Sequence, residues 1–310
     1  MRAPIAGSNR LSFIEFQLPS LTAVPPDGNG WLHEIKHDGY RTEIIVECGH
    51  ARALTRRGFD WSSKYALVVE AAAKLKVNSA IIDGEVIVFN GDGRSDFAAL
   101  RSAVRWQPER LVFMAFDLLH LDGMDFRGRP LIERRVALSA LIGGHKGGVL
   151  QFNEHVAGGG TAFFREVDRL GLEGMVSKRV SSPYRSGRTE TWLKTKCYEE
   201  AVYEVAGVLC EPGRPTVAYL VTPDANRRYV GGAYVALNDQ MLERLWARVQ
   251  SKASAVKGVE AKRGTQWLKP GLIARVRCLK GEAKLQHATL QEVADRFEEF
   301  TFARRFDSDI

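Results

Sequence analysis

Apolar and polar residues begin to alternate at Trp31, after a stretch rich in proline and glycine. Residues 1–30 lack this periodicity and are predicted to form an irregular N-terminal arm. Three short β-prone runs follow, separated by Gly39 and by Gly49-His50, and this spacing predicts an antiparallel meander of strands. The runs cover residues 31–35, 41–47 and 51–55.

Further along the chain, segments with helical spacing alternate with strands rich in isoleucine and valine. Asp96 is a predicted N-cap. The predicted helices cover residues 65–76, 96–105, 129–142 and 160–170, and the predicted strands cover 79–89, 111–119, 174–179 and 191–196. Because the order follows no regular β-α-β repeat, it predicts the α+β class, with antiparallel sheets.

The pattern changes after about residue 197, where short strand-like runs surround a single helix. The runs cover residues 203–211, 216–222, 229–234 and 273–279, and the helix covers 238–251. A small barrel with one intervening helix is the pattern of an OB-fold, which often carries nucleic-acid contacts. The domain boundary is predicted within residues 196–205.

The composition is that of a globular chain large enough for two modest domains. It has 310 residues, of which 45% are hydrophobic and 26% charged, and this excludes a disordered or fibrous protein. The net charge of +7 suits a polyanionic partner, but many enzymes are equally basic. Four widely spaced cysteines predict no structural zinc site. We expect a cytoplasmic protein without membrane association, because no signal peptide or spanning segment is evident.

Lys36 is the first candidate for chemistry. It ends a predicted strand and is followed by an Asp-Gly turn and an arginine, in the segment from Glu34 to Arg41. A lysine in such a place can be a nucleophile, but in isolation this segment is better explained by a solvated lysine before an ordinary hairpin turn. The segment must therefore be considered together with others along the chain.

Five further segments follow in a fixed order. They are Thr-Arg-Arg-Gly at 55–58, Asp-Gly-Glu at 83–85, Phe-Asp-Leu-Leu at 116–119, Glu-Gly-Met-Val-Ser-Lys at 173–178 and Trp-Leu-Lys-Thr-Lys at 192–196. Together with Lys-x-Asp-Gly-x-Arg they resemble the covalent nucleotidyltransferases, which include DNA ligases, RNA ligases and mRNA capping enzymes. The segment 182–197 is most similar to the ligase module of bacterial end-joining (LigD-type) ligases.

The resemblance, which covers roughly residues 31–288, implies a nucleotidyltransferase domain at 31–198 and an OB-fold domain at 199–310. It further implies an ATP-dependent DNA ligase that acts in repair or end joining on nicked or broken duplex DNA. In that scheme Lys36 forms a phosphoramidate with AMP, the adenylate passes to a DNA 5′-phosphate, and a 3′-hydroxyl displaces AMP. We expect a monomer in the bacterial cytoplasm, associated with the nucleoid.

A lysine must lose its proton before it attacks phosphorus, although its ordinary pKa is about 10.4. Lys194 and Lys196 alternate on one predicted strand and could favour the neutral amine while they neutralise the triphosphate. By resemblance, Glu173 is a ligand for Mg²⁺ or Mn²⁺, Glu85 binds the ribose and shares the metal, and Phe116 stacks on the adenine. The remaining candidates for nucleotide binding are Glu34, Arg41, Arg56 and Lys178.

Several of these residues also have plain structural interpretations. Phe116 could be a buried strand aromatic, Asp83 a turn carboxylate, and Lys178 and Arg188 solvated charges. His37 is not a candidate, because strand alternation would place it on the opposite face from Lys36.

The C-terminal region departs from the family pattern. Related ligases end their OB-fold domain with a basic segment that orients pyrophosphate during the first step, and no clean copy is evident here. Arg296 or Lys284 could substitute, and self-adenylylation with ATP is expected to suffer more than the sealing of preadenylated DNA. Because so few residues precede Trp31, end joining would need a Ku-like end-binding protein and a separate polymerase.

Three alternative functions would use the same or similar domains. An mRNA guanylyltransferase would use GTP with the same lysine chemistry, and an RNA ligase would share the first step. A non-catalytic OB-fold protein would bind DNA through an inactive nucleotidyltransferase domain.

Overall fold

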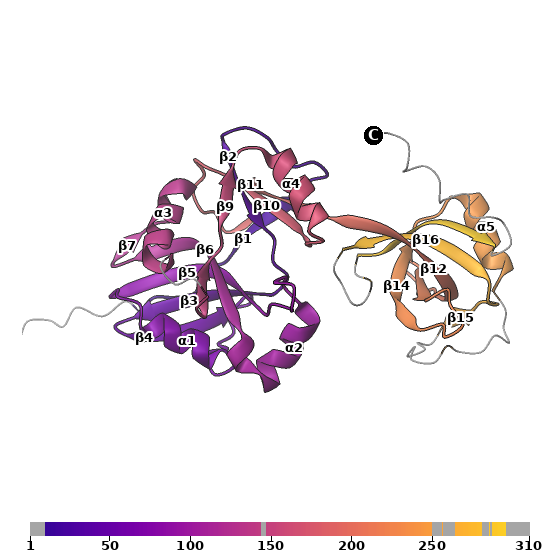
Figure 1. Ribbon diagram of the computed structural model, residues 1–310, viewed down its shortest axis with the longest axis horizontal. Helices are drawn as coiled ribbons and strands as arrows, with labels where there is room; N and C mark the ends of the chain where they lie inside the picture. The colour runs from indigo at the N-terminus through magenta and orange to yellow at the C-terminus, as the bar shows by residue number, and fades with distance from the viewer. Residues whose placement is uncertain are drawn as a thin grey trace, which may run out of the picture. The chain divides into compact units, whose positions relative to one another are not determined.

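The computed structural model describes residues 10–143, 147–249, 256, 264–280, 285 and 287–295. The chain divides between Cys197 and Tyr198 into two compact units (Figure 1). Each unit has its own sheets and its own hydrophobic core. No helix among the described residues is both long enough and apolar enough to cross a membrane.

The first sheet of the first unit has five strands in the order β1-β11-β10-β2-β9. These are β1 (Gln17–Leu21), β2 (Trp31–Ile35), β9 (His155–Ala157), β10 (Gly174–Arg179) and β11 (Gly187–Lys196). β1 runs parallel to β11, and the other neighbours are antiparallel. Helix α4 (Gly160–Arg169) packs against β10 and β2.

The second sheet follows the order β4-β3-β5-β6-β7, with β8 parallel to β6. Its strands are β3 (Tyr40–Glu47), β4 (His50–Thr55), β5 (Ser79–Ile87), β6 (Val112–Leu121), β7 (Met124–Asp125) and β8 (Leu150–Phe152). The helices of this part are α1 (Ala66–Ala73), α2 (Phe97–Trp106), the 3-10 helix η1 (Pro108–Arg110) and α3 (Leu131–Ile142). They cover an aliphatic core that includes Ile44, Ile82 and Leu100.

The predicted three-stranded meander is wrong at its first step. β3 and β4 pair as expected, but β2 belongs to the other sheet, so residues 36–39 carry the chain from one sheet to the other. Gly39 makes this crossing possible, because a Cβ there would lie 2.3 Å from the carbonyl oxygen of Val86. The predicted N-cap Asp96 is confirmed, since its side chain accepts a hydrogen bond from the Ala99 N–H at 2.8 Å.

The irregular arm predicted for residues 1–30 contains a strand, β1. Pro19 lies within it, which sequence rules disfavour, but β1 is an edge strand, where a missing N–H costs little. The strand is held by tertiary contacts: Phe16 and Gln17 are both buried, and the Tyr184 hydroxyl accepts a hydrogen bond from the Gln17 N–H at 3.0 Å. Such long-range contacts cannot be predicted from local sequence periodicity.

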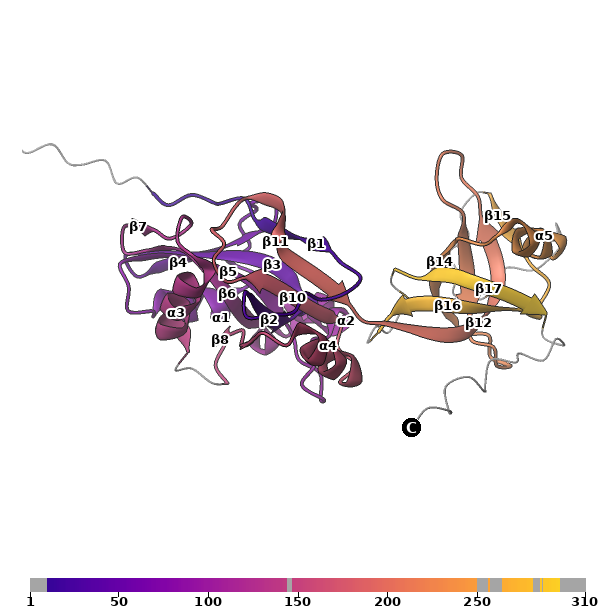
Figure 2. The same cartoon turned by 90° about the horizontal axis from the view of Figure 1, so that it is seen from above.

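The second unit contains β12 (Tyr198–Leu209), β13 (Val217–Val221), β14 (Tyr229–Val235), α5 (Asp239–Ala247), β15 (Thr265–Trp267), β16 (Leu272–Leu279) and β17 (Thr289–Asp295). The sheet order is β13-β14-β17-β16-β12-β15, and β13 also pairs with β12. Five strands therefore form a closed circuit of pairing, around a core that includes Val208, Leu220 and Leu290. Figure 2 shows β16 and β17 side by side. The sequence analysis identified neither β15 nor β17.

Candidate functional site

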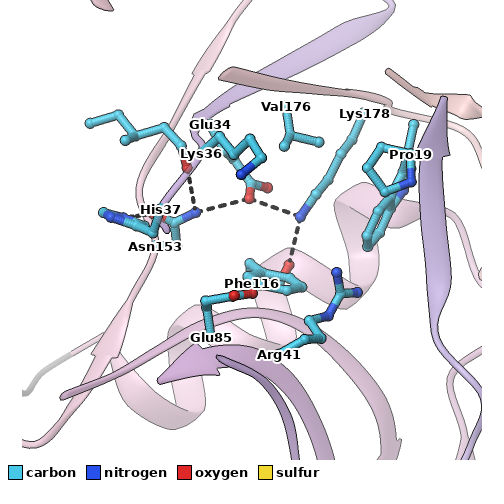
Figure 3. Close-up of a pocket in the computed structure, with 12 residues that line it drawn as sticks. Pro19, Glu34, Lys36, His37, Arg41, Glu85, Phe116, Asn153, Val176 and Lys178 are labelled. Atoms are coloured by element: carbon cyan, nitrogen blue, oxygen red, sulfur yellow. Dashed lines mark hydrogen bonds and ion pairs between the residues drawn. The ribbon is translucent and has the colours of Figure 1, made fainter. Parts of the chain in front are cut away.

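A cavity opens between the two sheets of the first unit (Figure 3). Its empty volume is about 530 Å³, including space open to solvent. It is lined by Pro19, Glu34, Ile35, Lys36, His37, Arg41, Glu85, Phe116, Asn153, Val176, Lys178 and Trp192. Six of these are candidate site residues from the sequence.

Lys36 follows directly after β2, and its amine forms an ion pair with Glu173, which directly precedes β10. The antiparallel pairing of β2 with β10 brings the two together, and the Lys36 N–H donates to the Gly174 carbonyl at 2.9 Å. Burial raises the pKa of Glu173, and the charge of Lys36 opposes that shift. The candidate nucleophile thus has a carboxylate partner of increased basicity.

Lys194 and Lys196 lie on β11, opposite Val176 and Gly174 of β10. Neither lysine lines the cavity, but Lys194 feels the charge of Lys36 at the cavity edge. Burial lowers the pKa of Lys194, and the charges of Lys196 and Lys36 lower it further. The cluster therefore disfavours the protonated form of Lys194.

Glu34 is buried within β2 at the inner end of the cavity. One of its oxygens, Oε2, accepts hydrogen bonds from Lys178 Nζ at 2.8 Å and from Asn153 Nδ2 at 3.1 Å. Its other oxygen, Oε1, is buried without a hydrogen bond, 3.5 Å from the guanidinium of Arg135. Burial lowers the pKa of Lys178 to about 8. Lys178 is thus the partner of a buried carboxylate and not a solvated charge.

The Phe116 ring, on β6, is almost fully buried at one wall of the cavity. The Arg41 guanidinium lies 4.5 Å from its centroid and the Lys178 amine 4.3 Å from it. Arg41 is itself tied down by two 2.6 Å hydrogen bonds to Asp83. Asp83 is fully buried within β5 and also accepts a hydrogen bond from the Tyr184 hydroxyl at 2.8 Å, so its interpretation as a turn carboxylate is wrong.

Glu85 lies on β5, two residues beyond Asp83, and its carboxylate reaches the cavity. Burial raises its pKa to about 7, while the charges of Arg41 and Lys36 oppose the shift. Within the described part of the chain, no group of three or more His, Cys, Asp or Glu side chains is arranged to hold a metal ion. Glu85 and Glu173 therefore offer at most two carboxylates near Lys36.

His37 lines the same cavity as Lys36, so its predicted placement on the opposite face is wrong. The strand ends at Ile35, and beyond it the alternation of faces no longer applies. His37 Nε2 lies 3.1 Å from Asn153 Oδ1, and burial lowers the pKa of His37 to about 4, which leaves the ring neutral near pH 7. Figure 3 shows how Asn153 connects His37 with Glu34.

Sequence reasoning missed Asn153 and Trp192 as cavity residues. Asn153 follows the short strand β8 and has no recognisable motif around it, whereas Trp192 stood in a segment already singled out. Arg56 is exposed just after β4 and is not among the residues that line the cavity. Lys284 and Arg296 lie outside the described residues.

The first unit, which holds this cavity between its two sheets, has the nucleotidyltransferase fold of ligase domains, and solved structures with the same fold are ligases. The structure titled mycobacterial DNA ligase D complexed with ATP and MES superposes with a TM-score of 0.56 at 24% identity, covering 90% of this chain and 94% of that one. A Lig E DNA ligase gives a TM-score of 0.59 at 15% identity, covering 91% of this chain and all of that one.

The family model for the ATP dependent DNA ligase domain matches residues 21–196, and the chain belongs to this family. The multifunctional non-homologous end joining protein LigD of Pseudomonas aeruginosa is 32% identical over 274 residues, which cover 84% of this chain. The LigD protein of Mycobacterium tuberculosis is 31% identical over 178 residues, or 57% of this chain. This chain covers only 32% and 23% of those relatives' lengths.

Proposed function

We propose that this protein seals nicks or breaks in duplex DNA with ATP, in DNA repair or end joining, through a covalent lysyl-AMP intermediate on Lys36. The observation that carries the proposal is the pairing of Lys36 with Glu173 at the cavity edge, together with Phe116 and the Glu34 oxygen without a hydrogen bond inside it. The cavity thus combines a nucleophile, a proton acceptor and a place for a flat base.

In the first step the neutral Lys36 amine forms a bond to the α-phosphorus of ATP, and the bond from that phosphorus to the bridging oxygen breaks. Pyrophosphate leaves with the bonding electrons, and Glu173 is placed to receive the proton of the amine. Lys194 and Lys196, on the strand beside β10, offset charge on the phosphates. The adenylate then passes to a DNA 5′-phosphate, and a 3′-hydroxyl displaces AMP.

Glu34 supports ATP as the donor nucleotide. The exocyclic amino group of adenine is a hydrogen-bond donor, whereas guanine carries a carbonyl oxygen at the equivalent position. The Glu34 carboxylate forms ion pairs with Lys178 and Arg135, and its buried Oε1, which has no hydrogen bond, is an acceptor. A guanine oxygen facing it would leave two acceptors unsatisfied, which argues against a GTP-dependent capping enzyme.

Glu85 and Glu173 fit a Mg²⁺ or Mn²⁺ ion, because two carboxylates together with substrate phosphate oxygens are the usual protein setting for such ions. No hydrogen bond joins the Glu85 carboxylate to any described residue, which leaves its oxygens available. A bound divalent ion would offset phosphate charge during nucleotide transfer. Arg41 and Lys178 contribute by fixing Phe116 and Glu34, and Arg56 remains a candidate for phosphate contact.

We further propose a nucleotidyltransferase domain at residues 31–198, preceded by the segment 1–30, and an OB-fold DNA-binding domain at 199–310. The closed circuit of five strands with α5 between β14 and β16 supports an OB-fold barrel. A Ku-like end-binding protein and a polymerase would supply the other steps of end joining. The proposed setting is the bacterial cytoplasm at the nucleoid, with the protein acting as a monomer.

Incubation with Mg²⁺ and radiolabelled ATP tests the proposal. We expect a covalent label that survives denaturation, that is absent in Lys36→Ala, and that is retained in the exposed control Lys64→Ala. The labelled protein should then seal nicked duplex DNA without added ATP. Labelling by GTP alone would assign a capping enzyme, sealing of RNA alone an RNA ligase, and the lack of any label would favour the non-catalytic DNA-binding protein.

A further inference from the structure

Trp106, at the C-terminal end of α2, is a large aromatic side chain without a place in the core. It is 71% exposed, more than any other large apolar side chain that the structure describes. The inner face of α2 is packed through Leu100 and Ala103, both fully buried, so the helix does not depend on Trp106 for its anchoring. The proposed ligation chemistry leaves this side chain without a role.

The exposed face of α2 is also basic. Arg101 and Arg105 are four residues apart and therefore lie on the same face of the helix, and both are exposed. The Arg105 guanidinium lies 4.9 Å from the Trp106 ring centroid. The helix itself contains no acidic residue, and Arg110 on η1 adds a further exposed guanidinium. An indole edged by guanidinium groups combines a stacking surface with anion-binding groups.

The other end of α2 touches the segment that carries the nucleophile. The Asp38 N–H donates to Ser95 Oγ at 3.1 Å, and the rings of Tyr40 and Phe97 are in contact with centroids 5.3 Å apart. Ten helical residues at a rise of 1.5 Å span about 15 Å. This length corresponds to about four to five stacked nucleotides at 3.4 Å each.

We propose that Trp106, Arg101 and Arg105 form a platform that binds unpaired nucleotides of a DNA strand close to the end being joined. A base stacks on the indole, and the two guanidinium groups hold the flanking phosphates. Within a duplex each base already stacks on its neighbours, so an exposed indole gains most from an unpaired base. The inference rests on the proposed function, because it specifies which form of broken end the same enzyme would favour.

Binding of a fluorescently labelled oligothymidine to the full chain, followed by anisotropy, tests the platform. Loss of one stacking contact lowers affinity by about 5- to 100-fold, and we expect Trp106→Ala to show this loss. Trp106→Phe should keep most of the affinity, whereas Trp106→Leu, which is apolar but not aromatic, should not. Val136→Ala, at an exposed apolar position on α3, is the matched control and should bind normally.

Ligation provides a second readout. Trp106→Ala should join ends with single-stranded overhangs of five or more nucleotides less efficiently, while its ATP labelling and its sealing of a fully paired nick stay unchanged. Equal oligothymidine binding by wild type and Trp106→Ala, or equal binding by the Leu and Phe variants, would overturn the platform. If the wild-type protein takes no label from ATP, the proposed function fails, whereas the binding comparison still decides the platform.

Discussion

Single residues in the cavity are held in place by charged partners. Arg41 was a candidate for nucleotide binding, yet its guanidinium donates two hydrogen bonds to Asp83. It lies 4.8 Å from the ring centroid of Phe16 and 4.5 Å from that of Phe116. Its geometry therefore suits the support of the aromatic wall. Motif order predicted that these residues would act together, but it could not assign which of them face each other.

The Glu34–Lys178 pair gives a prediction for Lys178→Met. Removing one partner leaves a buried charge, which costs about 3–5 kcal/mol in typical proteins, and we expect the lower end because Arg135 remains 3.5 Å from Glu34. Urea unfolding measures the change. The double variant with Glu34→Gln should lose less stability than the two single variants added together. Additive losses would show that the two charges are energetically independent.

Glu43 gives a pH-dependent prediction. It is fully buried on β3, and burial raises its pKa to about 8. Because this pKa lies above the ordinary 4.5, the stabilisation from its protonated form is complete below about pH 4.5 and is lost as the pH rises through about 8. Each pH unit in this window can cost up to about 1.4 kcal/mol.

Glu43→Gln cannot titrate at this position, and its amide oxygen can still accept the hydrogen bond that the Ile14 N–H donates to Glu43 at 3.2 Å. We expect the variant to gain stability relative to the wild type as the pH rises from 5 to 9, measured by urea unfolding at each pH. Parallel stability curves for the two proteins would contradict the assignment.

At the scale of secondary-structure elements, much of the first unit could be predicted from periodicity. Residues 31–35, 174–179 and the start of α2 match the structure closely, because amphipathic strands and a capped helix carry local signals. β1 and the short strands β7, β8 and β9 could not be predicted, because long-range pairing determines them. Asn153 directly follows β8 and is positioned by that strand, so no local pattern identified it.

The segment before and including β1 gives a prediction for Phe16→Ala. Phe16 is buried, and its ring lies 4.8 Å from the Arg41 guanidinium. It therefore supports Arg41, which in turn contacts the Phe116 ring. We expect a loss of about 3–5 kcal/mol in stability and a higher KM for ATP in the labelling reaction. Phe13→Ala removes a neighbouring ring, whereas the rings near the Arg41 guanidinium in the described part of the chain are Phe16, Phe116 and Trp192. This variant should lower stability while leaving that KM nearly unchanged.

At the scale of the whole molecule, the two compact units have distinct cores, and the match to the ligase family, residues 21–196, lies within the first of them. Sequence reasoning recognised both parts, because ordered motifs mark the first and a change of periodicity marks the second. The net charge of +7 alone could not separate a DNA-binding protein from a basic enzyme. The cavity around Lys36 is the observation that favours an enzyme.

The C-terminal departure from the family pattern gives a prediction for two sealing rates of the full chain, one with a preadenylated nick and one with an ordinary nick and ATP. The family resemblance implies a basic C-terminal segment that orients pyrophosphate during lysine adenylylation, and the sequence has no clean copy of it. We therefore expect that step to be slow and phosphodiester formation to be spared. We expect a preadenylated nick to be sealed at least about tenfold faster than an ordinary nick supplied with ATP, a ratio that reflects about 1.4 kcal/mol in the barrier of the first step. Lys36→Ala should seal only the preadenylated nick. Equal rates with both substrates in the wild type would mean that other residues of the chain perform the role of the missing segment.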